Sequence, residues 1–257
     1  MKIAIFYHSV TGNTEFAAKM IKKGINESGN ECDLFYIHHL EFNDYEKYDL
    51  LGFGTPVFAF REMTPVKNFI QNLPKMDKYA FIFCTCNSNK GNTLYRMASY
   101  LKRKGIKVFK GKVFYFPSSY TVWRKKGQKD VIKKSEVNKM VNFGLNLVSI
   151  YEKAKIERKL PTFYYSILNG ILGRFSSDTN LRIYLGKIYV NTELCNKCGD
   201  CEKICPADAI KLDPYPKISK KCTGCCGCIN LCPNGALYTS KTKNRPTYKF
   251  DESLLEK

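Results

Sequence analysis

The feature that most constrains this chain is a cysteine pattern that occurs twice near its C-terminus. Each copy has three cysteines at two-residue gaps and a fourth that follows a three-residue gap and precedes a proline: Cys195, Cys198, Cys201 and Cys205-Pro206, then Cys222, Cys225, Cys228 and Cys232-Pro233. Two-residue gaps let three thiolates wrap three corners of a cubane from one tight loop, whose amides face the sulfides. The pattern therefore predicts two four-iron, four-sulfur clusters. A pair of zinc sites is the alternative, although zinc sites rarely add a third thiolate at the next two-residue gap.

Over about residues 188–240 the chain resembles the bacterial two-cluster ferredoxins, in which the fourth cysteine reaches across to the other cluster. The resemblance implies one cluster held by Cys195, Cys198, Cys201 and Cys232, and a second held by Cys205, Cys222, Cys225 and Cys228. Cys226 is a ninth cysteine whose spacing fits neither cluster. We interpret it as a spare buried thiol; a ligand exchange under oxidation is the alternative.

The first 120 residues alternate short apolar runs with longer mixed segments, which is typical of strands joined by helices in a parallel sheet. The predicted strands are Lys2–His8, Glu31–Tyr36, Leu50–Gly54, Ala80–Thr85 and Lys107–Phe116. The predicted helices are Thr14–Ser28, Pro65–Leu73, Gly91–Lys104 and, further on, Asp130–Lys159. This spacing predicts an α/β domain with a small doubly wound sheet of five parallel strands.

A run of small hydroxyl residues and a glycine joins the first strand to the first helix. Its amides, hydroxyls and helix N-terminus suit one phosphate group, and no Walker motif follows. The run resembles the FMN phosphate loop of flavodoxins. This implies that FMN is bound by Ser9, Thr11, Gly12, Asn13 and Thr14. An ordinary helix cap by Ser9 or Thr11 is the alternative.

In flavodoxins the flavin ring lies between two further loops, after the third and fourth strands. By position these imply FMN contacts from Thr55, Pro56, Val57, Phe58, Thr85, Cys86, Asn87 and Gly91. Phe58 is a candidate for stacking on the ring, and core packing is nearly as good an interpretation. The Trp and Tyr that flavodoxins often place around the ring are not assigned by the sequence. The histidines, His8, His38 and His39, show no metal-ligand spacing.

The whole chain resembles the flavodoxin–ferredoxin fusion proteins of anaerobes, sometimes called ferrodoxins. The resemblance implies a flavodoxin-like FMN domain at 1–159, a connecting and docking segment at 160–187 and a small α+β two-cluster ferredoxin domain at 188–257. We expect electron transfer between a bound FMN and two [4Fe-4S] clusters, with partner redox proteins outside. An electron carrier is favoured over an enzyme. The alternatives are a flavin-dependent reductase of a small molecule and a redox-responsive nucleic-acid-binding protein.

Positive charge is concentrated in the middle of the chain. Of the net +19, residues 96–187 hold 21 Lys/Arg and 5 Asp/Glu, whereas residues 1–95 hold 10 of each. This predicts a docking face for an acidic redox protein; a nucleic-acid or anionic-membrane surface is the less favoured alternative. The N-terminus lacks a signal-peptide pattern and no apolar run reaches the ~20 residues of a spanning helix, so we expect a cytoplasmic protein, where cysteines are metal ligands before they are disulfides.

Overall fold

The computed structural model describes residues 1–256. In its N-terminal part, a parallel sheet has the strand order β2-β1-β3-β5-β6, and the short strand β4 pairs with β3. The strands are β1 (Lys2–Tyr7), β2 (Glu31–Tyr36), β3 (Leu50–Phe58), β4 (Arg61–Glu62), β5 (Tyr79–Cys86) and β6 (Lys107–Tyr115). The helices are α1 (Asn13–Glu27), α2 (Thr64–Asn72), α3 (Thr93–Arg103), α4 (Lys134–Leu145) and α5 (Leu147–Glu157), with 3-10 turns η1 (Tyr45–Lys47) and η2 (Thr121–Trp123). The predicted doubly wound sheet of five parallel strands is confirmed.

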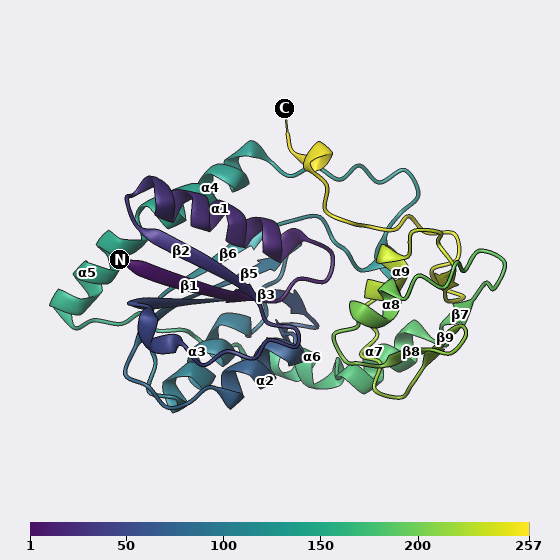
Figure 1. Cartoon of the computed structure of the whole chain (residues 1–257), viewed down its shortest axis with the longest axis horizontal. Helices are drawn as coiled ribbons and strands as arrows, with labels where there is room; N and C mark the ends of the chain where they lie inside the picture. Colours follow the sequence, from purple (N-terminus) through teal and green to yellow (C-terminus); the bar gives the residue numbers. More distant parts are fainter. Residues whose placement is uncertain (257) are drawn as a thin grey trace.

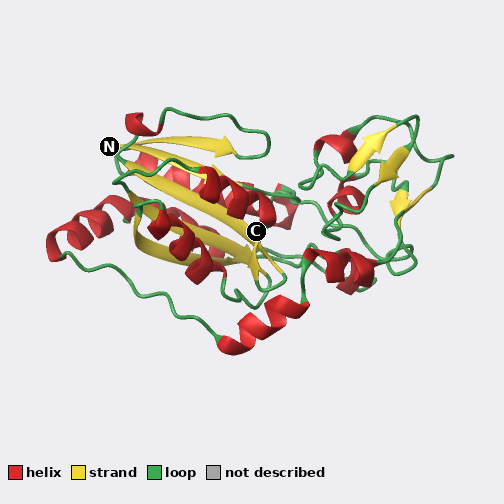
Figure 2. Ribbon diagram, turned by 90° about the horizontal axis from the view of Figure 1, so that it is seen from below, coloured by secondary structure: helices red, strands yellow, loops and turns green. Residues whose placement is uncertain are grey.

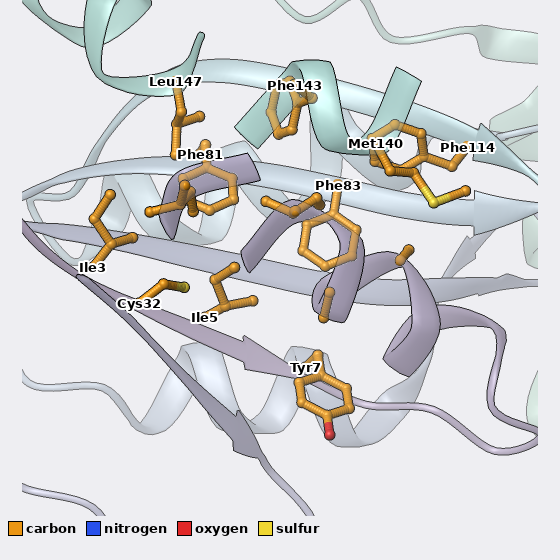
Figure 3. Packing of buried hydrophobic residues seen from close by; sticks show 14 of the residues in the cluster. Ile3, Ile5, Tyr7, Cys32, Phe81, Phe83, Phe114, Met140, Phe143 and Leu147 are labelled. Atoms are coloured by element: carbon orange, nitrogen blue, oxygen red, sulfur yellow. The ribbon is translucent and has the colours of Figure 1, made fainter. Parts of the chain in front are cut away.

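Two apolar cores cover the two faces of this sheet. Because side chains alternate along a strand, Ile3 and Ile5 of β1 face the core shared with α1 and α4, whereas Ala4 and Phe6 face the core shared with α2 and α3. Figure 3 shows the first core, where phenylalanines of β5 and β6 pack against α4. Burial of these rings contributes to the domain's stability, at about 25 cal/mol per Å² of apolar surface removed from water.

The prediction of one helix over Asp130–Lys159 is wrong, because the segment forms two helices that meet at Asn146. The first of them, α4, lies against α1 with glycines at the contact. A Cβ at Gly24 would lie 2.0 Å from the Val141 carbonyl oxygen, and one at Gly144 would lie 2.1 Å from the Ile21 carbonyl oxygen. This close approach fixes α4 on the sheet, and α5 then turns along the sheet's edge (Figure 1).

The C-terminal part is small and built around cysteines. It contains two antiparallel strand pairs, β7 (Tyr189–Val190) with β10 (Leu237–Tyr238) and β8 (Ile210–Leu212) with β9 (Pro216–Ile218). Its helices are α8 (Asp200–Lys203) and α9 (Gly227–Leu231). The small core between them includes Cys201, Cys205, Cys226 and Cys228. The arrowheads of the parallel sheet point toward this part (Figure 1).

Two segments connect the parts. Residues 160–187 hold α6 (Ile167–Phe175) and α7 (Asp178–Leu185), which run along the outside of the molecule (Figure 2). The last residues, with the turn η3 (Glu252–Leu254), leave the cysteine-rich part and return to the first core. There Phe250 stacks on Phe16 of α1 with ring centroids 4.5 Å apart. The domain boundary predicted between residues 187 and 188 does not anticipate that the end of the chain packs on the N-terminal domain. Within residues 1–256, no helix is both long enough and apolar enough to cross a bilayer.

Candidate functional site

A cavity of about 630 Å³ opens where the parallel sheet meets the cysteine-rich part. Its walls come from the loops that follow the C-terminal ends of β1, β3, β5 and β6, the edge of such sheets where ligands bind. The predicted residues that line it are Ser9, Thr11, Asn13, Thr14, Pro56, Val57, Phe58, Thr85, Cys86 and Asn87. Thr55 and Gly91 are buried and Gly12 is half-buried, and none of the three lines it. A cavity of this size suits a cofactor-sized ligand.

The loop after β1 is shaped to receive an anion. Gly12 has a φ of +99° and immediately precedes α1, where the first N–H groups of the helix have no intrahelical acceptor. The Gly12 amide donates to Ser9 Oγ over 3.2 Å, which closes the turn. Thr14 and Thr85, both buried, join their hydroxyls at 2.7 Å and so tie this loop to β5. Hydroxyls and free helical amides together fit a phosphate group.

The C-terminal tail supports the same loop from outside. The Phe250 amide donates to the Thr11 carbonyl over 2.7 Å, and the Tyr248 hydroxyl donates to Asn13 Oδ1 over 2.6 Å. A Cβ on Gly12 would lie 2.6 Å from Phe250 Cβ, so glycine is required by both the turn and the tail. Residues 235 positions apart in the chain therefore share one loop.

Aromatic side chains form the wall that a flavin ring would contact. Phe58 meets Tyr120 edge-on with ring centroids 6.1 Å apart, and Tyr120 meets Trp123 edge-on at 5.0 Å. The buried Tyr120 hydroxyl has no hydrogen-bond partner among residues 1–256, and burial is the main cause that raises its pKa. A buried polar atom in a cavity wall is satisfied when a polar ligand fills the cavity, so these residues fit FMN.

The loop of residues 116–124, which carries Tyr120 and Trp123, is the main part of the site that the sequence did not indicate. Its position after the fifth strand was a usable signal, since all four cavity loops follow strands of one sheet. Phe175 and Tyr184, from α6 and α7, also line the cavity without any motif.

The eight predicted cluster ligands fall into two groups in space. Cys195, Cys198, Cys201 and Cys232 line one small cavity. Burial raises the pKa of the Cys225 thiol to about 11, and the neighbouring Cys222 and Cys205 thiols add to this. The pKa of Cys228 is raised by burial and by four neighbouring thiols, those of Cys225, Cys222, Cys205 and Cys226. The first group is one that the ferredoxin resemblance implies, and the assignment of all eight ligands stays a prediction.

The spacing of potential ligand atoms bears on the alternative of zinc sites. Tetrahedral zinc with bonds of about 2.3 Å needs thiolates about 3.8 Å apart. Among residues 1–256, the only group of three or more potential ligands with donor atoms within 4.8 Å of one another is His38, His39 and Asp208, which contains no cysteine. Among these residues, no three cysteine sulfurs therefore lie at the spacing of a tetrahedral zinc site.

Backbone amides also point at the ligand sulfurs. Ala209 N donates to Cys205 Sγ over 3.3 Å, Gly224 N to Cys222 Sγ over 3.4 Å, and Ala236 N to Cys232 Sγ over 3.2 Å. Such amide-to-sulfur bonds stabilise thiolates and raise cluster potentials.

Cys225 belongs to both sites, since it is a predicted cluster ligand and also lines the large cavity. Close by, the cysteine-rich part touches the phosphate loop: a Cβ on Gly227 would lie 2.7 Å from Val10 Cγ1 and 3.5 Å from Cys225 Sγ. The absence of a side chain at Gly227 therefore lets the two parts approach closely.

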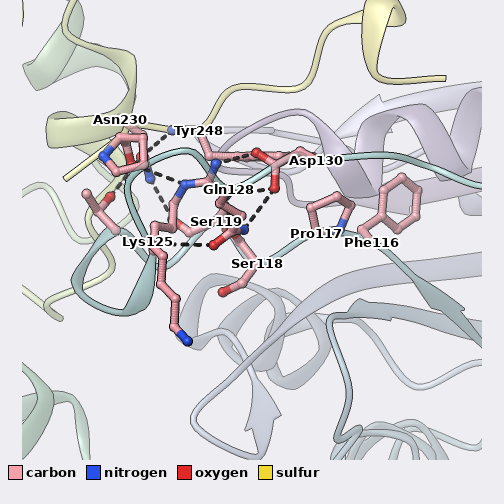
Figure 4. Close-up of polar contacts among 12 residues, drawn as sticks. Phe116, Pro117, Ser118, Ser119, Lys125, Gln128, Asp130, Asn230 and Tyr248 are labelled. Carbon is pink, nitrogen blue, oxygen red and sulfur yellow. Dashed lines mark hydrogen bonds and ion pairs between the residues drawn. The ribbon is translucent and has the colours of Figure 1, made fainter.

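A polar network holds the two parts in this position (Figure 4). Asn230 of α9 donates to the Ser119 carbonyl over 2.8 Å, and its Oδ1 accepts from Thr121 Oγ1 and from the Tyr248 amide, each over 2.8 Å. The buried Arg124 donates to carbonyls of Ser118 and Pro246 and pairs with Asp130. The loop of residues 116–124 is thus fixed at once to the cluster-bearing helix and to the tail.

Comparison with known proteins agrees with both parts. The flavodoxin family matches residues 5–102, and the 4Fe-4S binding domain matches residues 188–211. A flavodoxin from Clostridium saccharobutylicum is 30% identical over 122 residues, which cover 45% of this chain and 76% of the relative. Ferredoxin-1 of Rhodobacter capsulatus is 41% identical over 51 residues, which cover 17% of this chain and 78% of the relative. An archaeal flavodoxin structure covers 60% of this chain and 99% of its own, with 16% identity and a TM-score of 0.46.

The fold, the cavity and the cysteine groups define an electron-transfer protein that binds FMN and [4Fe-4S] iron–sulfur centres. The chain belongs to the flavodoxin family and carries a ferredoxin domain at its C-terminal end, as a flavodoxin–ferredoxin fusion.

Proposed function

We propose that this protein passes electrons internally between an FMN in the large cavity and two [4Fe-4S] clusters. The cluster of Cys205, Cys222, Cys225 and Cys228 is the nearer to the flavin, and that of Cys195, Cys198, Cys201 and Cys232 is the outer one. When bound, FMN exchanges one or two electrons and each cluster exchanges one. The assembly can therefore take up electrons in pairs and pass them on one at a time, or the reverse. The observation that carries this proposal is that Cys225 lines the flavin cavity.

The chain contributes proximity and rigidity. The contact of Gly227 with Val10, and the bonds of Asn230 to residues 119, 121 and 248, hold the inner cluster site against the cavity. Cys198 is the exposed ligand, which favours exchange with outside proteins at the outer cluster. The outside partner is an acidic redox protein that docks on the basic region 96–187, where 21 of the 42 Lys/Arg lie.

Rapid reduction of the holoprotein tests internal transfer. After a light-driven pulse of electrons, flavin and cluster absorbance should equilibrate at a rate that does not depend on protein concentration. A rate proportional to protein concentration would show transfer between molecules and contradict the proposal. In Cys198→Ser, internal equilibration should persist while transfer to an added ferredoxin-dependent acceptor falls. Catalytic turnover of a small-molecule acceptor would instead support the reductase alternative.

A further inference from the structure

The segment between the two domains presents an apolar ridge to solvent, which we define by Ile156, Tyr164, Ile167, Leu168, Ile171 and Phe175. Their exposed fractions are 79%, 85%, 73%, 67%, 50% and 73%. None of the nine residues of α6 is buried. This many aliphatic and aromatic side chains at such exposure within residues 156–175 mark an interaction surface rather than ordinary scatter.

The ridge is held outward by specific contacts. The Ser166 amide donates to Asn92 Oδ1 over 2.8 Å, and Asn92 Nδ2 donates to the Ser166 carbonyl over 2.9 Å. Asn92 is itself buried, and the Ser166 hydroxyl caps α6 by accepting from the Asn169 amide. Because the start of α6 is anchored in this way to the turn before α3, the outward position of its apolar side chains belongs to the fold.

Charge around the ridge is mostly positive: Glu152 and Glu157 lie beside Ile156, where Glu157 pairs with Lys153, but the segment that follows carries only basic charges. Residues 158–177 contain no Asp or Glu and include Arg158, Lys159 and Arg174, while Lys153 and Lys155 lie one turn before them. Asp178, the next acid along the chain, is engaged by Arg61 and by Thr64. Apolar side chains bordered by Lys, Arg and Tyr are typical of segments that lie in the interface of an anionic bilayer.

The shape of the surface and the total charge favour a lipid surface over a protein one. Figure 2 shows α6 at the outer edge of the molecule, where an extended layer such as a bilayer surface can reach its exposed apolar side chains. A second copy of the chain is disfavoured, because each copy carries a net charge of +19.

We infer that this protein docks on the surface of anionic membranes through the apolar ridge and its basic border, without spanning the bilayer. The C-terminal end of α6 reaches the flavin cavity, since Phe175 and Ser176 line it. Docking therefore brings the mouth of that cavity to the lipid surface. This inference does not depend on the internal transfer proposed above, because binding to lipid is measured without electron flow.

Sedimentation of the holoprotein with vesicles tests the inference. At about 0.15 M salt, vesicles of phosphatidylcholine with about one third phosphatidylserine should bind the protein, and pure phosphatidylcholine should bind it at least about tenfold more weakly. The triple variant Ile167→Gln, Leu168→Gln, Ile171→Gln should lose about tenfold or more of the binding with unchanged FMN and iron content. Val131→Gln, a control at an exposed apolar residue outside the ridge, should bind like the wild type.

A second measurement locates the contact directly. Brominated lipid should quench the fluorescence of the tryptophan introduced in Leu168→Trp, once the signal of the single native tryptophan has been subtracted. The tryptophan introduced in Val131→Trp should not be quenched. Absence of binding to anionic vesicles, or equal binding by the triple variant, would overturn the inference. If the wild type forms a dimer and the triple variant is a monomer, the ridge is an interface with a second copy of the chain, and this result would also overturn the inference.

Discussion

The side chain of Asn230 offers the sharpest test of how the two domains are joined. In Asn230→Ala the Ser119 carbonyl, the Thr121 hydroxyl and the Tyr248 amide all lose their partner. Each buried group left unpaired costs about 1–3 kcal/mol, and rotation of the hydroxyl and entry of water recover part of this, so we expect a net loss of about 3 kcal/mol.

Part of this loss should appear as weaker FMN binding, because the loop of residues 116–124 lines the cavity and is fixed by Asn230. If half or more of the lost free energy appears as weaker FMN binding, the FMN dissociation constant rises about tenfold to a hundredfold, since 1.4 kcal/mol corresponds to a factor of ten. Titration of flavin-free protein with FMN, followed by fluorescence quenching, measures this. The control is Asn234→Ala, an exposed asparagine with one bond, to the Leu194 carbonyl. A dissociation constant within about twofold of the wild-type value, with clusters intact, would refute the reasoning.

Three further predictions concern the cofactor sites and pH. Cys225→Ser should reduce bound iron from about eight atoms per chain to about four, whereas Cys226→Ser should leave it unchanged; equal losses would refute the ligand assignment. Gly12→Ala should weaken FMN binding about tenfold, because the new Cβ is strained at positive φ and collides with Phe250 of the C-terminal tail. The control is Gly29→Ala, which is also at positive φ (+77°) but in open space and should not weaken FMN binding. Similar FMN affinities of the two variants would contradict the role of the tail. Burial lowers the pKa of His8 from 6.5 to about 3 in the folded protein, so as the pH falls the unfolded chain takes up this proton first, and the free energy of unfolding decreases between about pH 6.5 and pH 3. The urea midpoint of His8→Gln should therefore fall less than that of the wild type between pH 7.5 and 5.5. An identical pH dependence of the two midpoints would argue against burial of His8 as the cause.

Local patterns carried most of what could be predicted. The cysteine spacing concerns residues a few positions apart, and the strands follow from short apolar runs, so the parallel sheet and the cluster-binding segment were accessible to sequence reasoning. The break at Asn146 was not, because the apolar periodicity continues on both sides of it and helical periodicity alone does not locate an end.

The junction between the domains was beyond reach for a physical reason. The bond between Thr121 and Asn230 joins residues 109 positions apart, and that between Asn13 and Tyr248 joins residues 235 apart. No periodicity or spacing records such pairs, because each residue alone is typical of a loop or a helix. The sequence indicated a connecting and docking segment at 160–187, but only the structure shows that the apolar side chains of the ridge face solvent.

These long-range bonds also couple the inner cluster to the flavin cavity. Coupling free energy between two binding sites is reciprocal, so whatever a formed cluster contributes to FMN affinity, FMN contributes to the stability of that cluster. Cys205→Ser removes a ligand of the inner cluster that does not line the cavity, yet it should disturb α9 and weaken FMN binding about tenfold. Cys198→Ser, at the exposed outer site, should change FMN affinity far less. Equal FMN affinities in the two variants would mean that the inner cluster and the flavin cavity are adjacent but not coupled. A lower FMN affinity in Cys205→Ser, together with faster loss of the inner cluster from flavin-free protein, would show that one network of side chains stabilises both sites.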